Sequence, residues 1–411
     1  MTARYAQNVA TDRRDAQTSA GTHARLGTGL STHEDGRAAT MAALDAALAP
    51  LAGDPADLVL LFISPQHEDV QRAIIDIVTE RVGSATVLGC SAAGVIGARR
   101  EIEEAPAIAA WAASLPGIGI QPFRLTFQRE DDHAIIEGLE DLPSADQQPV
   151  VMLLADPFSF PADVLLDHLN DAAAGVPVVG GMASGGLEAG RNSLYFNDEI
   201  LRDGAVGAIL TGPGMRTIVS QGCRPVGETY AVTRAQENVL FELGGAPAMD
   251  RIEELYSASS ERDQLLIRRG LHVGSAITET KPELVRGDFL VRNVIGVDRA
   301  TGAIAISDRL EIGTTVQFQV RDAGSAREDL RVVLERERIA APGAVAGGLL
   351  FSCNGRGQAL FGEPDHDVGA VRRVFGDIPI SGFFAAGEIG PVSGKSFLHG
   401  FTASILLFRE A

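Results

Sequence analysis

The chain has 411 residues, enough for two or three domains, and 45% of them are hydrophobic, enough for buried cores. The net charge of −19 opposes binding to nucleic acid and to anionic lipid. The three cysteines form no C-x-x-C pair, which excludes a disulfide framework and a cysteine-rich zinc site. No apolar run approaches the ~18 residues that span a bilayer. We therefore expect a cytoplasmic protein with neither a nucleic-acid nor a membrane partner.

Residues 1–34 are rich in Thr, Ser, Arg, Asp and Gly and show almost no apolar periodicity. Such a composition does not bury enough surface to offset the entropy lost on ordering. The sequence therefore predicts a disordered tail over residues 1–34. Order is expected to begin where Met41, Leu44 and Leu48 recur at helical spacing.

A strand-helix-strand pattern then occurs three times. In the first copy the apolar run Leu58–Ile63 indicates a strand buried on both faces, and a helix and a second apolar strand follow it. Similar copies begin at Val150 and at Gly348. These copies predict an α/β protein of mixed α+β type, with related strand-helix-strand units and mixed β-sheets.

The second strand of each copy runs into a G-x-x-x-x-G segment, at residues 89–94, 180–185 and 382–387. Glycine permits positive φ or a close backbone approach, and ligands often bind where strands leave an open α/β sheet. The segments are therefore candidates for ligand binding, although simple chain reversal explains them as well. Their glycine spacing fits neither a phosphate-binding loop nor a dinucleotide fingerprint.

The composition changes between the second and third copies. A hairpin is predicted from Phe289–Gly296 and Ala303–Ile306, and the alternation in Thr315–Arg321 predicts a half-solvated strand. We place a domain boundary near residue 240. The predicted domains are residues 35–240 and 241–411.

Several segments resemble the FIST family, the F-box and intracellular signal transduction proteins, and the resemblance covers nearly everything after residue 35. The segments that carry it are Gly89-Cys90-Ser91 with Gly94, Gln221–Gly227 with Asn238, Val291-Arg292-Asn293 with Thr301-Gly302-Ala303, Val320-Arg321-Asp322, Ser352–Gly357, Gly387–Gly390 and His399–Thr402.

The resemblance implies an intracellular sensory protein that binds a small ligand, with amino acids as one proposed ligand class. It implies no enzyme activity, and a separate signalling protein such as a histidine kinase as the partner. Some relatives are haem-dependent nitric oxide sensors, so haem is the alternative cofactor. His399 and His272 are then the candidate axial ligands. No cluster of Asp, Glu and His has convincing metal-binding spacing.

Arg356 lies between two glycines in a turn, where its guanidinium suits a ligand carboxylate. Glu388 follows the third glycine segment and suits an ammonium group. We therefore predict that the two domains face each other across a cleft lined by the three glycine segments, Arg356 and Glu388. The predicted ligand-binding residues are Gly89, Cys90, Ser91, Gly94, Arg292, Asn354, Arg356, Glu388, His399 and Thr402.

Cys90 beside Ser91 supports one enzyme alternative, a Cys90-dependent transferase or hydrolase. The glycines do not frame it as a nucleophile elbow, and its counterparts in the other copies are Gly181 and Phe383. A small buried cysteine is the interpretation that the sequence favours, and no catalytic residue is assigned.

Overall fold

The computed structural model describes residues 23–410 except 131–132, 140–141, 143, 279–280 and 282. This part of the chain forms two compact units. Unit 1 comprises residues up to 219, residues 333–398 and residues from 403 onward, and unit 2 comprises residues 220–332 and 399–402. The fold is of the α+β class with mixed sheets, as the sequence predicts.

Unit 1 is built from three structural repeats, and the ends of β14, α6, β25 and β26 in the third repeat extend into unit 2. The first consists of β1 (Arg25–Ser31), α1 (Gly36–Leu48), β2 (Leu58–Ile63), α2 (Gln71–Val82), β3 (Thr86–Ser91), β4 (Gly94–Gly97), β5 (Arg100–Glu103) and β6 (Ile108–Ser114). The second consists of β7 (Gly119–Glu130), β8 (His133–Glu137), β9 (Pro149–Ala155), α3 (Ala162–Ala172), β10 (Val178–Met182), β11 (Leu194–Phe196), β12 (Glu199–Leu201) and β13 (Ala205–Thr211). The third consists of β14 (Met215–Gln221), α6 (Ala323–Ala340), β22 (Val345–Cys353), α7 (Gln358–Phe361), α8 (His366–Phe375), β23 (Ile380–Ala385), β24 (Glu388–Val392), β25 (Lys395–His399) and β26 (Thr402–Arg409).

Each repeat builds one sheet around a parallel pair, β2 with β3, β9 with β10 and β22 with β23. The last strand of each repeat then returns antiparallel to the first strand of that pair. The hairpin between them leaves for another sheet. β4 pairs with β23, β11 pairs with β3, and β24 pairs with β10. Every sheet is therefore completed by a hairpin from another repeat.

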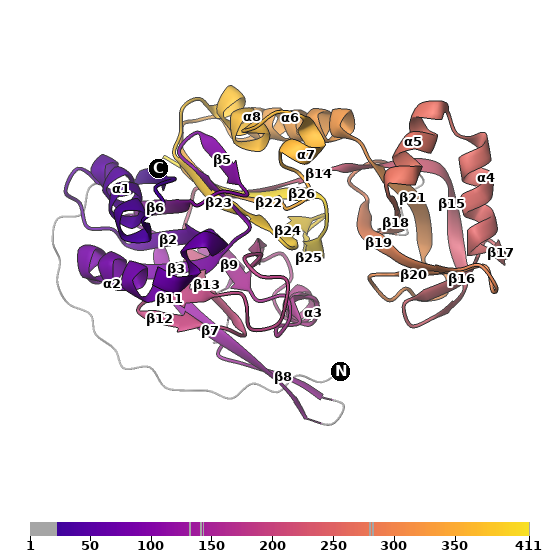
Figure 1. The fold of residues 1–411 in the computed structure, drawn as a ribbon, viewed down its shortest axis with the longest axis horizontal. Helices are drawn as coiled ribbons and strands as arrows, with labels where there is room; N and C mark the ends of the chain where they lie inside the picture. Colours follow the sequence, from indigo (N-terminus) through magenta and orange to yellow (C-terminus); the bar gives the residue numbers. More distant parts are fainter. Residues whose placement is uncertain are drawn as a thin grey trace. The chain divides into compact units, whose positions relative to one another are not determined.

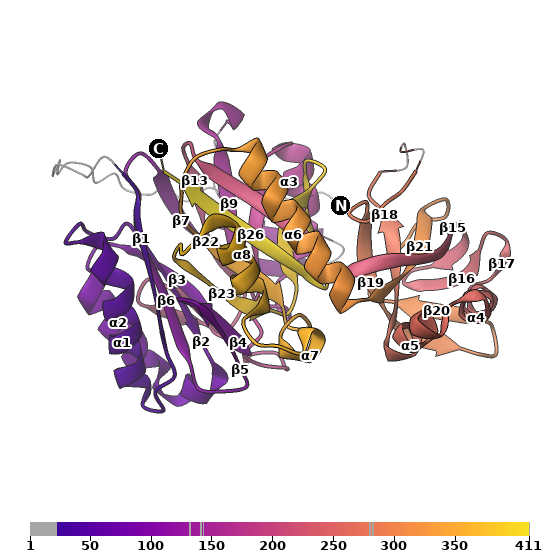
Figure 2. The same ribbon diagram turned by 90° about the horizontal axis from the view of Figure 1, so that it is seen from above.

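The apolar runs found in the sequence are explained by packing on both sheet faces. Leu58, Leu60 and Phe62 of β2 face an inner core to which all three sheets contribute. Their alternating neighbours, Val59 and Leu61, face an outer core formed with α1 and α2. Figures 1 and 2 show these helices on the outer side of the sheet that contains β2 and β3.

Unit 2 is a β-barrel with two helices. Its elements are β15 (Cys223–Gln236), β16 (Val239–Leu243), β17 (Ala246–Pro247), α4 (Ala248–Ala258), α5 (Glu261–Arg269), β18 (Leu271–Ala276), β19 (Phe289–Asp298), β20 (Ala303–Ile306) and β21 (Thr315–Arg321), followed by the start of α6. The strand order is β15-β21-β18-β19-β20-β16, and β15 also pairs with β16, so the sheet closes on itself. Val273, Ile304 and Phe318 contribute to its apolar core.

One sequence prediction needs correction, and the domain boundary near residue 240 stays a prediction. Arg25–Ser31 is not disordered, because it forms β1 along the whole length of β6, a pairing that local composition does not reveal. The rest of the predicted tail up to residue 22 lies outside the described residues. The compact units also divide the chain differently from a linear boundary at residue 240, because unit 2 is inserted between β14 and β22 of the third repeat.

The first glycine of each G-x-x-x-x-G segment lies inside a strand, where two backbones approach closely. An added Cβ would lie 2.0 Å from the Leu61 carbonyl oxygen at Gly89 and 1.7 Å from the Leu350 carbonyl oxygen at Gly382. Gly180 meets Leu153 in the same way. Close approach of paired strands, rather than a turn, is what requires these glycines.

We expect Gly89→Ala and Gly382→Ala each to lower the free energy of unfolding by at least about 1–3 kcal/mol, because the partner backbone has to move. Denaturant titration followed by circular dichroism measures this. Gly296→Ala in β19 is the matched control, because its Cβ would lie 3.7 Å from the nearest atom outside its chain neighbours, the Ala305 Cβ. Equal stability of all three variants would contradict the close-approach explanation.

Candidate functional site

The three glycine segments meet inside unit 1. The Ser184 and Gly185 N–H groups donate to the Ser91 carbonyl oxygen at 3.2 Å, and the Met182 N–H donates to the Gly387 oxygen at 2.8 Å. The Ser184 hydroxyl donates to the Phe384 oxygen. These segments therefore join the repeats to one another. The segments thus meet as predicted, but inside one compact unit and through direct hydrogen bonds rather than across a cleft between two domains.

Arg356 is buried in an ion pair rather than presented at a rim. Its Nε and Nη2 donate to the two carboxylate oxygens of Asp367 at 2.7 and 2.9 Å, and the two side chains are 1% and 2% exposed. Burial acts to raise the pKa of Asp367, but the Arg356 charge and the His366 hydrogen bond hold this pKa well below its usual range. Arg356 is thus part of the unit 1 core.

The other predicted residues of unit 1 are also enclosed, except Asn354. Glu388 is fully buried in β24 opposite Gly181, not at a rim, and Asn354 is exposed at the end of β22. Cys90 is fully buried, and burial raises the pKa of its thiol well above the usual value. A protonated thiol inside the core suits packing better than nucleophilic attack.

The remaining predicted residues lie in unit 2. Arg292 pairs with Asp308 at 2.5 Å, and His399 and Thr402 are buried. Phe401, between them in the chain, packs against His272 with ring centres 4.4 Å apart and lies 5.1 Å from the Arg321 guanidinium. Burial and the Arg321 charge lower the pKa of His272 to about 4, so its ring is neutral at pH 7.

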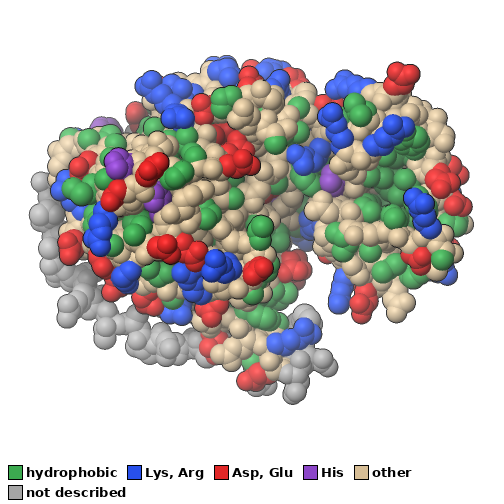
Figure 3. All heavy atoms as spheres, viewed as in Figure 1, with side chains coloured by type: hydrophobic (Ala, Val, Ile, Leu, Met, Phe, Trp, Pro, Cys, Tyr) green, Lys and Arg blue, Asp and Glu red, His purple; other side chains and the backbone are tan. Residues whose placement is uncertain are grey.

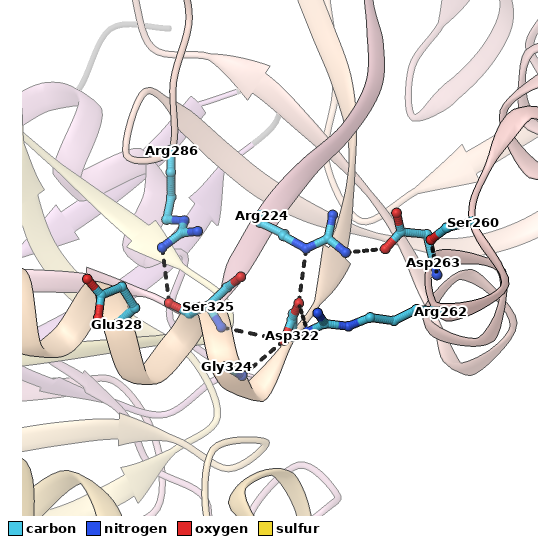
Figure 4. Close-up of a pocket in the computed structure, with 9 residues that line it drawn as sticks. All are labelled: Arg224, Ser260, Arg262, Asp263, Arg286, Asp322, Gly324, Ser325 and Glu328. Carbon is cyan, nitrogen blue, oxygen red and sulfur yellow. Dashed lines mark hydrogen bonds and ion pairs between the residues drawn. The ribbon is translucent and has the colours of Figure 1, made fainter.

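Unit 2 also holds an open pocket of about 560 Å³, which we call the arginine pocket. Its walls come from the first turns of α5 and α6, from β15 and from the loop before β19 (Figure 4). The residues that line it are Arg224, Ser260, Arg262, Asp263, Arg286, Asp322, Gly324, Ser325 and Glu328.

Asp322 organises one wall of the arginine pocket. Its carboxylate accepts from Arg224 Nε at 3.0 Å and Arg262 Nη2 at 2.9 Å, and it caps α6 by accepting from the Gly324 N–H at 2.9 Å. Burial opposes this charge, yet the bond from Arg224 and the N–H groups of α6 hold the pKa of Asp322 below its usual value. Arg224 pairs with Asp263 as well.

Arg286 approaches from the opposite wall (Figure 4). Its Nη1 donates to the Ser325 carbonyl oxygen at 3.1 Å. Its Nε is buried and finds no partner among the residues that the structure describes. This guanidinium therefore has more donors than the Ser325 carbonyl oxygen uses, and the α6 wall that it meets also carries Glu328. Guanidinium donors suit a carboxylate or another oxyanion.

None of the predicted site residues lines the arginine pocket. Arg224 and Asp322 do occur in two of the segments that carry the family resemblance, each at the end of a strand, so a signal existed for them. Arg262 and Arg286 lie outside those segments, so no pattern in the sequence pointed to them. The tertiary structure places them in the arginine pocket. Among the described residues, no group of three or more His, Cys, Asp and Glu side chains is arranged to hold a metal ion.

Two general properties bear on partners. On the face seen in Figure 3, charged side chains of both signs are interspersed over both units. Within the described part of the chain, no helix is both long and apolar enough to cross a bilayer.

We expect Arg356→Ala to lower the free energy of unfolding by about 3–5 kcal/mol, because it leaves the Asp367 carboxylate buried without its cation. Thermal and denaturant unfolding measure the loss. Arg299→Ala, at an exposed turn, is the matched control and should change stability by less than about 0.5 kcal/mol. An Arg356→Ala protein as stable as the control would return Arg356 to the list of available ligand-binding residues.

Glu101 of β5 reaches the start of α8, where it accepts from the Val368 N–H at 2.7 Å. Burial, and then the Asp367 charge, raise the pKa of Glu101 from 4.5 to about 8. Between these values the folded protein holds a proton that the unfolded chain has released, so the free energy of unfolding falls as pH rises from about 4.5 to about 8. The pKa of Asp367 is lowered, so its protonation changes the free energy of unfolding only at more acidic pH.

Glu101→Gln should therefore flatten the dependence of stability on pH across this window, since its amide oxygen still accepts from Val368. Denaturant midpoints at pH 5, 6, 7 and 8 for the variant and the unchanged protein provide the comparison. Identical slopes would show that Glu101 titrates normally.

Known protein families match nearly the whole chain. The FIST N domain matches residues 57–246 and the FIST C domain matches residues 248–391. Uncharacterized protein Rv0628c of Mycobacterium tuberculosis strain H37Rv is 44% identical over 94% of this chain and 100% of its own length. Uncharacterized protein Mb0898c of Mycobacterium bovis strain AF2122/97 is 41% identical over 94% of this chain and 99% of its own length. The protein therefore belongs to the FIST family, as its sequence segments indicate.

Proposed function

We propose that this protein is a sensory protein that binds a small carboxylate-bearing metabolite in the arginine pocket of unit 2. FIST domains are associated with sensing in signal transduction. The observation that carries the proposal is the guanidinium of Arg286, which lines an open pocket of about 560 Å³ and donates to a neutral carbonyl oxygen.

Binding fits the pocket better than catalysis does. Arg224 and Arg262 are held by Asp322 in ion pairs, and the pocket lining contains neither a cysteine nor a histidine. Fixed charges of this kind position a ligand, whereas a nucleophile needs an adjacent base to activate it. The Cys90-dependent enzyme alternative finds little support in a thiol that the core encloses.

Amino acids belong to the proposed ligand class, because each carries a carboxylate. The protein would then act in the cytoplasm and signal through a separate protein, such as a histidine kinase. Haem binding through His272 or His399 stays a prediction. The His272 ring packs directly on Phe401, so haem ligation would need that contact to open.

Arg286→Ala should weaken binding of a carboxylate about 10- to 100-fold, the loss of a charged hydrogen bond worth about 1.5–3 kcal/mol. A thermal-shift screen over amino acids and small organic acids finds a ligand, and calorimetric titration of the full chain measures its affinity. Arg299→Ala is the control and should bind normally. A carboxylate that binds Arg286→Ala as tightly as the unchanged protein would move the ligand site elsewhere.

A further inference from the structure

The acidic side chains of the arginine pocket are already paired with arginines. Asp322 accepts from Arg224 and Arg262, and Asp263 pairs with Arg224. Glu328, at the α6 wall, accepts through both of its carboxylate oxygens from Arg331, at 2.7 and 3.0 Å. Every carboxylate that lines the pocket thus has a cation beside it.

The arginines of the pocket are not all balanced in the same way. Arg224 and Arg262 have acidic partners, whereas Arg286 has a neutral carbonyl oxygen as its hydrogen-bond acceptor among the described residues. Arg286 is therefore the arginine of the lining whose hydrogen bond goes to a neutral group, and the acidic lining residue that feels its charge is Glu328, whose pKa it helps to lower. The planar fork of Arg286 is suited to one carboxylate.

An amino acid brings a second charge into such a pocket. Its ammonium group loses hydration on entering and needs a carboxylate to replace the lost water. Here each carboxylate is already hydrogen-bonded to an arginine, so an ammonium group would have to compete with that arginine for it. The half-exposed pair of Glu328 with Arg331 is the one that it would open most easily. A hydroxyl or keto oxygen at the same carbon carries no such requirement.

We propose that the arginine pocket selects organic acids without an ammonium group, such as 2-hydroxy and 2-keto acids, over the amino acids of the same carbon skeleton. The inference rests on the proposed function, in which this pocket is the ligand site. It narrows the ligand class from any small carboxylate to a carboxylate whose neighbouring substituent is uncharged.

Matched pairs of compounds test the selection directly. L-lactate with L-alanine, phenyllactate with L-phenylalanine, 2-hydroxyglutarate with L-glutamate, and 2-hydroxyisocaproate with L-leucine differ in the hydroxyl or ammonium substituent. Calorimetric titration of the full chain at pH 7 should show the hydroxy acid of the best-binding pair at least tenfold tighter than its amino acid. The same hydroxy acid should lose affinity in Arg286→Ala and keep it in Arg299→Ala.

A second variant should weaken the selection without changing Arg286. Arg331→Ala releases the Glu328 carboxylate, so the amino acid of the best pair should gain affinity relative to its hydroxy acid. Circular dichroism confirms that this exposed substitution leaves the fold intact.

The possible failures are distinguishable. An amino acid that binds equally or more tightly, with binding lost in Arg286→Ala, overturns this selection but sustains the proposed function. The selection and the proposed function are both overturned if none of the eight compounds binds at millimolar concentration, or if the compounds bind Arg286→Ala as tightly as the unchanged protein.

Discussion

The three-repeat body depends on one close contact, made three times, between a strand glycine and the backbone of its parallel neighbour. Gly89, Gly180 and Gly382 let those backbones approach to a distance that excludes a Cβ. The chain then leaves each strand into a segment whose N–H and C=O groups are bonded by the other segments. Because each hairpin completes another repeat's sheet, no repeat can finish its own sheet alone. We expect the three repeats to fold as one cooperative unit for this reason.

Burial decides which charged residues are available for binding. Arg356 and Asp367 satisfy each other inside unit 1, and their pair is surrounded by Ser352, His366 and Phe361. Arg286 has the same side chain as Arg356 but faces an open pocket and a neutral acceptor. The contrast is one of environment, since the Arg356 charge is paired with a buried carboxylate, whereas Arg286 donates to a neutral carbonyl oxygen at an open pocket.

Unit 2 shows how a small barrel makes a binding site from element ends. The first turns of α5 and α6 bring Ser260 and Asp322 to one rim, where each caps its helix. The same Asp322 then orients Arg224 and Arg262. The Asp322 carboxylate therefore both caps α6 and holds two arginines, so it fixes this wall of the pocket. The Arg286 guanidinium across the pocket is not one of the groups that Asp322 holds.

The amino-acid sequence by itself determined the strand-helix-strand part of each repeat, because apolar runs such as Leu58–Ile63 and the helical spacing around Leu44 are local signals of burial. It also determined family membership, through short segments at strand ends. Tertiary structure alone decided that Arg25–Ser31 is a strand, since its order comes from pairing with β6 some 80 residues away. It likewise decided that Arg356 is buried and that Arg286 borders a pocket. A side chain's partners come from distant parts of the chain, and no local pattern records which carboxylate folding will bring to which arginine.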